Sequence, residues 1–163
     1  MKHSLEHSLV LREATEEDLP VFFEQQLDKT ANEMAAFTVK DPTDKDRFHA
    51  HWTKILNDHS IVKRTILLNG QIAGNILCFE FLGLPTIGYW IDKSYWGKGI
   101  ATHALSVFLE QYKARPLYAR VAHDNIASIR VLEKNGFVSF GVDKAFSEAR
   151  GEEMEELILI KQA

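Results

Sequence analysis

Apolar residues recur at helical spacing in the first third of the chain. A short strand over residues 9–12 precedes a helix that begins at Thr15, where Asp18 three residues later forms a variant of the capping box. A second helix covers residues 44–57, because its apolar side chains fall on one side of a helix. Residues 28–43 form a long connection of mixed polarity between the two helices. Long connections in compact domains are often functional, so this one is a candidate functional loop.

The pattern then changes to that of β-strands. Residues 61–68 and 71–81 are rich in β-branched and apolar residues, and Asn69-Gly70 between them is a strong signal for a hairpin turn. A third strand over residues 86–91 completes an antiparallel meander.

Helices and strands alternate in the second half of the chain. The expected order is a helix over 99–113, a strand over 117–121, a helix over 125–135 and a strand over 137–142. A last strand, over 155–160, follows a polar loop. A meander followed by this alternation predicts an α/β fold with one mixed sheet and helices on its faces.

The composition narrows the class of protein. At 163 residues, the chain is expected to form a single domain over residues 1–163. A net charge of −4 and no basic run argue against nucleic acid or an anionic membrane as the partner. Cys78 is the only cysteine, which excludes a disulfide framework and a cysteine-based zinc site, and no metal is expected. No signal peptide or membrane-spanning stretch is visible, so we expect a cytoplasmic protein.

The helix after Gly99 begins with a pattern that favours an anion. It is preceded by Gly97-Lys98-Gly99, and no acidic side chain stands in its first turn. Glycines let the backbone come close to a ligand, and the free N–H groups and dipole of a helix start attract negative charge. Lys98 adds a local positive charge. These residues alone are equally typical of a plain tight turn between a strand and a helix.

Two other phosphate-binding motifs fit poorly. The Walker pattern needs Gly, four residues and then Gly-Lys-Ser/Thr, a spacing that the chain does not contain. The dinucleotide pattern needs a further glycine where Thr102 stands, and a meander precedes this turn where a Rossmann unit should begin.

Two segments together carry a resemblance to a known family. Residues 95–102, Tyr-Trp-Gly-Lys-Gly-Ile-Ala-Thr, and residues 125–137, which begin Asn-Ile-Ala-Ser and end Asn-Gly-Phe, resemble the GNAT acetyltransferase superfamily. The chain is most similar to the branch that includes the ribosomal-protein N-terminal acetyltransferases. The order of elements fits that fold, a mixed, largely antiparallel sheet of about seven strands. Trp96 stands where this family usually has Gln or Arg, so phosphate binding is expected to rest on backbone N–H groups.

The resemblance implies acetyl-CoA as co-substrate. The turn and helix start would hold the pyrophosphate, and the strand ending at Ile91 would pair with the pantetheine arm. Asn125 would contact this arm, and it is equally a candidate helix cap. The implied cofactor-binding residues are Tyr89, Trp90, Ile91, Gly97, Lys98, Gly99, Ile100, Ala101, Thr102, Asn125 and Ser128.

Candidate catalytic groups are harder to assign. Many family members carry a tyrosine proton donor where this chain has Leu132, which makes Ser128 the nearest substitute. Glu80 and His123 are candidate bases for the acceptor amine, because carboxylate and imidazole groups can accept a proton. Removing the proton from a lysine-type amine at pH 7 costs about 4.6 kcal/mol, whereas an α-amine needs about 1 kcal/mol. The α-amine is therefore the easier acceptor.

The sequence thus predicts transfer of acetyl from acetyl-CoA to a primary amine, by direct attack and without metal. The acceptor is a small molecule or a peptide, and the protein is a monomer or a homodimer. Two alternatives remain: a non-catalytic acyl-CoA-binding module, and a nucleotide-binding regulatory domain.

Overall fold

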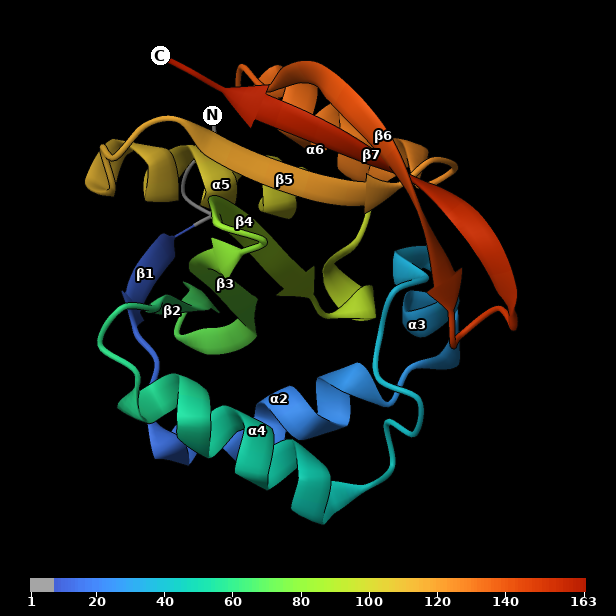
Figure 1. Ribbon diagram of the computed structural model, residues 1–163. Helices are drawn as coiled ribbons and strands as arrows, with labels where there is room; N and C mark the ends of the chain where they lie inside the picture. Colours follow the sequence, from blue (N-terminus) through green and yellow to red (C-terminus); the bar gives the residue numbers. More distant parts are fainter. Residues whose placement is uncertain (1–7) are drawn as a thin grey trace.

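The computed structural model describes residues 8–163, which form a seven-stranded sheet (Figure 1). The strand order is β1-β2-β3-β4-β5-β7-β6. Neighbouring strands are antiparallel except β4 and β5, which run parallel, so the predicted mixed, largely antiparallel sheet is confirmed. The strands are β1 (Leu9–Glu13), β2 (Val62–Leu68), β3 (Gln71–Phe81), β4 (Leu84–Ile91), β5 (Leu117–Ala122), β6 (Val138–Ser147) and β7 (Glu152–Lys161).

Helices cover both faces of the sheet, as predicted. In Figure 1, α2 and α4 lie together below β1 to β3, whereas α5 and α6 lie on the opposite side, beyond β5. Ile76 and Cys78 of β3 pack into the core with α5, and Leu77 packs against the core formed by α2 and α4. The helices are α2 (Leu19–Gln26), α3 (Lys29–Ala35), α4 (Lys45–Asn57), α5 (Ile100–Gln111) and α6 (Ile126–Lys134), with the short 3-10 helices η1 (Glu16–Asp18) and η2 (Lys93–Tyr95).

Asp18 fixes the start of α2 to the sheet. Its carboxylate accepts a hydrogen bond of 3.0 Å from the Thr15 N–H, which confirms the predicted capping box. The carboxylate also receives two bonds of 2.8 Å from the Arg12 guanidinium and one of 2.6 Å from the Thr65 hydroxyl. Burial acts to raise the pKa of Asp18, but these hydrogen bonds outweigh it, and the pKa lies below its ordinary value. The predicted helix therefore begins as η1, and α2 follows it.

The predicted connection over residues 28–43 contains a helix, so the prediction was wrong there. Helix α3 (Lys29–Ala35) begins at Asp28, whose carboxylate accepts a hydrogen bond of 2.7 Å from the Ala31 N–H. Seven residues span about two turns, which is too short for a clear hydrophobic period. Within residues 8–163, no helix has the length and the apolar character that crossing a membrane requires.

The polar loop expected between the last two strands is mostly strand. β6 continues to Ser147 and β7 begins at Glu152, with Lys144 paired opposite Glu155. Charged residues on an exposed hairpin have no apolar alternation, so the pattern resembles that of a loop. Cross-strand pairing, including the Lys144–Glu155 pair of opposite charges, extends the hairpin instead.

The end of β4 is held tightly against β3. Gly74 pairs with Ile91, and a Cβ atom built on Gly74 would lie 1.9 Å from the carbonyl oxygen of Trp90. The N–H of Asp92 donates a hydrogen bond of 2.8 Å to the Ala73 carbonyl just beyond this point. Glycine is therefore required at position 74, and the end of β4 follows β3 rather than β5.

Candidate active site

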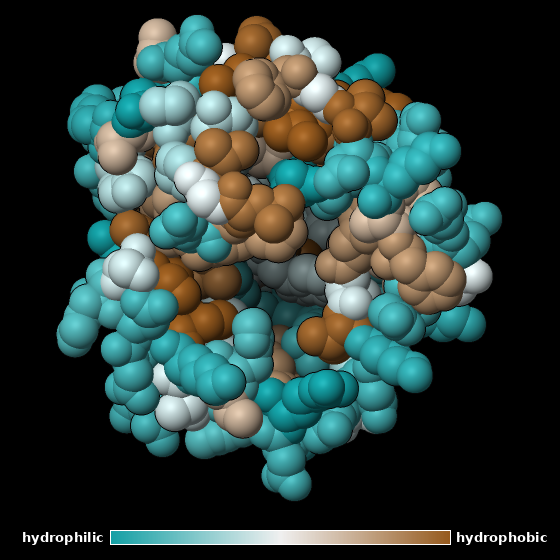
Figure 2. Space-filling view, in the orientation of Figure 1, coloured by the Kyte–Doolittle hydropathy of each residue, from teal (hydrophilic) through white to brown (hydrophobic). Residues whose placement is uncertain are grey.

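A cleft opens where β4 and β5 separate. Within residues 8–163, these two strands are paired at just two positions, Thr86 with Tyr118 and Ile87 with Ala119. Beyond Ile87 the strands diverge, and a cavity of about 420 Å³ lies between the end of β4, the start of α5, α6 and α3. Figure 2 shows a hollow over this end of β4. The divergence leaves one edge of β4 unpaired inside the cleft, which suits an extended ligand.

The turn before α5 borders one end of the cleft. Gly97 and Gly99 both have left-handed backbones, with φ values of 77° and 76°. A Cβ atom at either position would meet no atom within 4 Å, so the backbone conformation, and not a lack of space, favours glycine. The indole N–H of Trp96 donates a hydrogen bond of 2.9 Å to the Ile91 carbonyl. Trp96 thus fixes the turn to β4 instead of offering its donor to a ligand.

The first turn of α5 presents free donors to the cleft. Gly99 is the residue before the helix, where no side chain caps the first N–H groups and no acidic residue stands in the first turn. Arg130 and Lys134 line the cleft from α6. In the described part of the chain, no carboxylate forms an ion pair with either of them. Uncapped N–H groups, the helix dipole and these two cations together favour an anion at this end.

A pair of hydroxyl groups lies inside the cleft. Tyr89 extends from β4, and its hydroxyl oxygen lies 2.6 Å from the Ser128 Oγ atom of α6. Burial raises the pKa of Tyr89 to about 12, against a smaller opposing effect of the hydrogen bond with Ser128. Asn125 precedes α6, and its side-chain oxygen accepts a hydrogen bond of 3.3 Å from the Ser128 N–H. Asn125 is therefore a helix cap that also lines the cleft.

Helix α3 also lines the cleft, with Ala31, Met34 and Ala35, and we call this part of the cleft the α3 end. These are small or apolar side chains, in contrast to the cations and free N–H groups at the α5 end. Thr30 and Asp28, at the start of α3, lie near Lys93 of η2, with the Lys93 nitrogen 3.4 Å from the Thr30 hydroxyl. Helix α3 thus reaches the segment that leads from β4 into the glycine turn.

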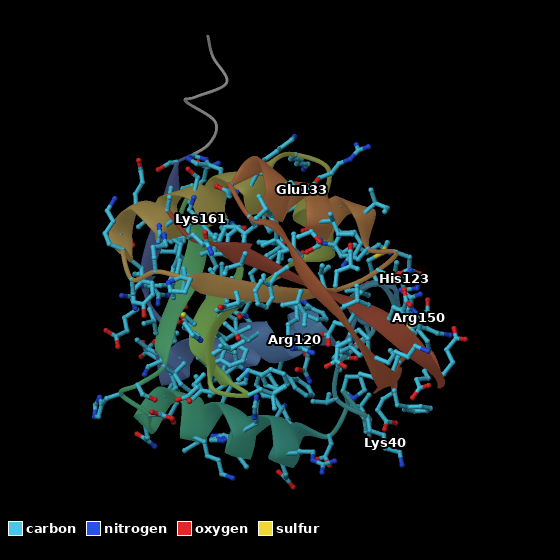
Figure 3. The ribbon with its side chains drawn as sticks, turned by 45° about the horizontal axis from the view of Figure 1, so that its top comes forward. Lys40, Arg120, His123, Glu133, Arg150 and Lys161 are labelled. Atoms are coloured by element: carbon cyan, nitrogen blue, oxygen red, sulfur yellow. The ribbon has the colours of Figure 1, made fainter. Side chains whose placement is uncertain are left out.

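Arg150 ties α3 to the start of α6. Its guanidinium donates hydrogen bonds of 2.5 and 2.9 Å to Asp124, just before α6, and its Nε–H donates one of 2.8 Å to the Glu33 carbonyl. Ser147 adds a bond of 2.5 Å from its hydroxyl to the Ala36 carbonyl. The bond from Arg150 holds the pKa of Asp124 below its ordinary value. Figure 3 shows Arg150 beside His123 at this edge of the molecule.

Arg120 lies outside the cleft. It points to the face of β5 away from α5, where it binds Glu156 at 3.1 Å and Asp143 at 2.7 Å (Figure 3). Its guanidinium also lies 5.1 Å from the centre of the Phe81 ring. Arg120 is thus neutralised by two carboxylates, and Arg130 and Lys134 are the cations that face the cleft.

Most of the predicted cofactor-binding residues come together in the cleft. Lys98 is exposed at the tip of the turn, outside the lining. His123 is exposed after β5, and Glu80 pairs with Pro85 at the end of β4 that lies away from the turn. Neither candidate base lies in the cleft lining. The predicted residues that do line it are Tyr89, Trp90, Ile91, Gly97, Gly99, Ile100, Ala101, Thr102, Asn125 and Ser128.

Several lining residues were missed from the sequence. Ala31, Met34 and Ala35 belong to the unpredicted helix α3, for which Asp28 as a cap was the available signal. The helix that carries Arg130 was predicted. The position of Arg130 in the cleft lining could not be predicted, because it depends on how α6 packs. In the described residues, no group of three or more His, Cys, Asp or Glu side chains is arranged to hold a metal ion.

Comparison with known proteins identifies the family to which this domain belongs. A family model described as an acetyltransferase (GNAT) domain matches residues 8–138. The probable N-acetyltransferase YjcK of Bacillus subtilis (strain 168) is 40% identical over 80 residues, which is 44% of this chain and 44% of YjcK. The chain thus spans less than half the length of that relative.

Solved structures share the fold over nearly the whole chain. RimL, a ribosomal L7/L12 alpha-N-protein acetyltransferase in complex with coenzyme A, has a TM-score of 0.80 and 22% identity, over 94% of this chain and 93% of RimL. AAC(6')-Ib, in complex with ribostamycin and coenzyme A, has a TM-score of 0.77 and 18% identity, over 95% and 93%. Because the family model covers well over half of its residues, this protein belongs to the GNAT acetyltransferase family.

Proposed function

We propose that this protein transfers the acetyl group of acetyl-CoA to a primary amine. The observation that carries the proposal is the cleft between β4 and β5, which ends at an uncapped helix start with two left-handed glycines. The pyrophosphate would bind the N–H groups of this turn, with Arg130 and Lys134 nearby. The pantetheine arm would lie along the free edge of β4, like an added strand. Coenzyme A in the structures of RimL and AAC(6')-Ib supports this choice of cofactor.

The acceptor is proposed to be an α-amine of a peptide or another amine of low pKa. RimL acts on a protein α-amine according to its name, and AAC(6')-Ib was solved with ribostamycin, so related folds occur with peptide and small-molecule ligands. Neither Glu80 nor His123 lines the cleft, which leaves no candidate base from the sequence beside the reacting atoms. An α-amine needs only about 1 kcal/mol to lose its proton at pH 7, so it can react without a strong base.

The reaction needs no covalent intermediate on the protein. The free amine attacks the thioester carbonyl, a C–N bond forms, and the C–S bond breaks with its electron pair moving to sulfur. Backbone N–H groups of β4 near Tyr89 to Ile91 are proposed to bind the carbonyl oxygen as it gains charge, an effect often worth ~3 kcal/mol. Cys78, the only cysteine in the sequence, is buried in the core against α5 and takes no part.

The first test measures binding and turnover separately. Acetyl-CoA at 100 times its dissociation constant should stabilise the fold by about 2.7 kcal/mol, which a thermal-unfolding experiment detects. Thiol release is then measured with a panel of peptides and small amines, and we expect peptides with free α-amines to be used before lysine side chains. No shift in melting temperature at millimolar acetyl-CoA contradicts the proposed function. Binding without thiol release from any amine would instead favour a non-catalytic acyl-CoA-binding module.

A further inference from the structure

Helix α6 carries no tyrosine on the side that faces the cleft. Leu132, where the resemblance to the superfamily would place a tyrosine, is 1% exposed in the core against α5. Ser128 lies four residues earlier, which places it on the same side of α6, one turn nearer to the helix start. Unlike Leu132, Ser128 lines the cleft.

A tyrosine hydroxyl nevertheless reaches this side of α6, from the opposite wall. Tyr89 points from β4 across the cleft, and its hydroxyl oxygen is 2.6 Å from the Ser128 Oγ atom. Ile76, the residue of β3 paired with Tyr89, belongs to the same core as α5. Tyr89 therefore bridges the two walls at the depth where β4 and β5 begin to separate, beside the proposed path of the pantetheine arm.

The resemblance to the family implies that Ser128 would donate a hydrogen bond to the sulfur of coenzyme A as it leaves. We infer that Tyr89 and Ser128 form one hydroxyl pair, in which Tyr89 donates to Ser128 and holds it in place for this role. This inference rests on the proposed function. The direction follows from acidity, because a phenol is a stronger hydrogen-bond donor than an aliphatic hydroxyl. A bond received by Ser128 also polarises its own O–H group and fixes its rotation toward the cleft.

The pair stabilises charge without giving up a proton. When the C–S bond breaks, the electron pair stays on sulfur, and the thiolate accepts the hydrogen bond from Ser128. The proton lost by the amine goes to water, and the thiolate takes a proton from water after release, since a thiol has a pKa of about 8.5. With a pKa of about 12, Tyr89 keeps its own proton throughout the neutral range. Ser128 is thus a catalytic residue, and Tyr89 is a positioning residue that acts through it.

The test is a double-mutant cycle on kcat at saturating acetyl-CoA. Tyr89→Phe keeps the ring and removes the donor, and we expect a three- to tenfold fall in kcat with the KM for acetyl-CoA changed less than twofold. Ser128→Ala should lower kcat by at least as much, and the double variant should be no slower than Ser128→Ala alone. Ser128→Thr, which keeps a hydroxyl at this position, should retain most of the activity.

Tyr118→Phe is the matched control, because Tyr118 packs against Phe140 outside the cleft, and its kcat should equal that of the parent. An unchanged kcat in Tyr89→Phe overturns the inference, as does a double variant whose loss is the product of the two single losses. Thermal unfolding with acetyl-CoA is measured on every variant. Loss of binding in the parent would contradict the proposed function itself, whereas retained binding with multiplicative losses contradicts only the hydroxyl pair.

Discussion

The two ends of the cleft are built in different ways. The α5 end is made mainly by consecutive residues of one turn, whose backbone N–H groups are placed by Gly97 and Gly99, with Arg130 and Lys134 of α6 beside them. The α3 end is made by a short helix from early in the chain, which Arg150, 117 residues away from Glu33, holds in place. One end thus depends on local conformation, and the other depends on contacts between distant segments.

This difference has a functional consequence. The proposed pyrophosphate site at the α5 end relies mainly on the free N–H groups of a helix start, to which Arg130 and Lys134 add positive charge. We propose that the acceptor binds at the α3 end, where its recognition depends on the side chains and the position of α3. Changes at the α3 end should therefore alter the acceptor and leave the cofactor alone.

Gly99→Val should give the largest effect, at the α5 end. Valine at a φ of 76° is strained by about 1–2 kcal/mol, so the turn must change its path and withdraw its N–H groups. We expect the affinity for acetyl-CoA, measured by calorimetry, to fall at least tenfold. Gly83→Val is the control, because Gly83 has a φ of 80° and equally open surroundings in the β3–β4 hairpin. If both variants lose affinity equally, general strain rather than the turn explains the result.

Arg150→Met should give a smaller effect, at the α3 end. It removes the bonds to Asp124 and to the Glu33 carbonyl, which are partly exposed and together worth about 1 kcal/mol. The expected result is a rise of about fivefold in the KM for the acceptor, with affinity for acetyl-CoA within twofold of the parent. Arg47→Met, on the exposed side of α4, removes the same charge away from the cleft. Equal losses for acceptor and cofactor would contradict the separation of the two ends.

The same division decides what the sequence could predict. The strand meander, the helix after Gly99 and the Asn125 cap follow from local patterns, and the structure contains all three. The turn proposed to bind the pyrophosphate could also be predicted, because its glycines and its uncapped helix start lie next to one another in the sequence. Spacing along the sequence is sufficient to predict a candidate site when all of its residues are neighbours in the chain.

The remaining features depend on tertiary structure. Helix α3 has seven residues, and contacts from Arg150 and Ser147 hold its C-terminal end, so its own sequence predicts it poorly. Tyr89 was expected to contribute as part of a strand, yet its hydroxyl meets Ser128, 39 residues later. The candidate bases show the converse: Glu80 and His123 have suitable chemistry, but the register of β3 and the end of β5 place both outside the cleft lining.

Asp124→Asn should give the smallest effect, and it depends on pH. The hydrogen bond from Arg150 lowers the pKa of Asp124 in the folded protein below its unfolded value of about 3.9. Its contribution to the free energy of unfolding is therefore complete above about pH 4 and is lost as the pH falls through the folded pKa. Because the Asp124 side chain is 43% exposed, we expect less than about 1 kcal/mol.

Urea unfolding at a series of pH values measures this difference between the parent and Asp124→Asn. The difference in the free energy of unfolding should be constant from about pH 5 to 8 and should shrink as the pH falls below the unfolded pKa of about 3.9 and through the lower folded pKa. Asp143→Asn is the matched control, because the pKa of Asp143 is also lowered. The larger cause is the hydrogen bond from the Lys144 backbone N–H, and the second is the hydrogen bond from Arg120. Asp143 lies outside the cleft, so Asp143→Asn should lower stability above about pH 5, by a difference that shrinks in acid, without changing the KM for the acceptor at about pH 7. For Asp124→Asn that KM should rise, in the direction of Arg150→Met but by a smaller factor, since the bond from Arg150 to α3 remains. A rise of the same size in both aspartate variants would mean that lost stability, and not the position of α3, sets acceptor binding.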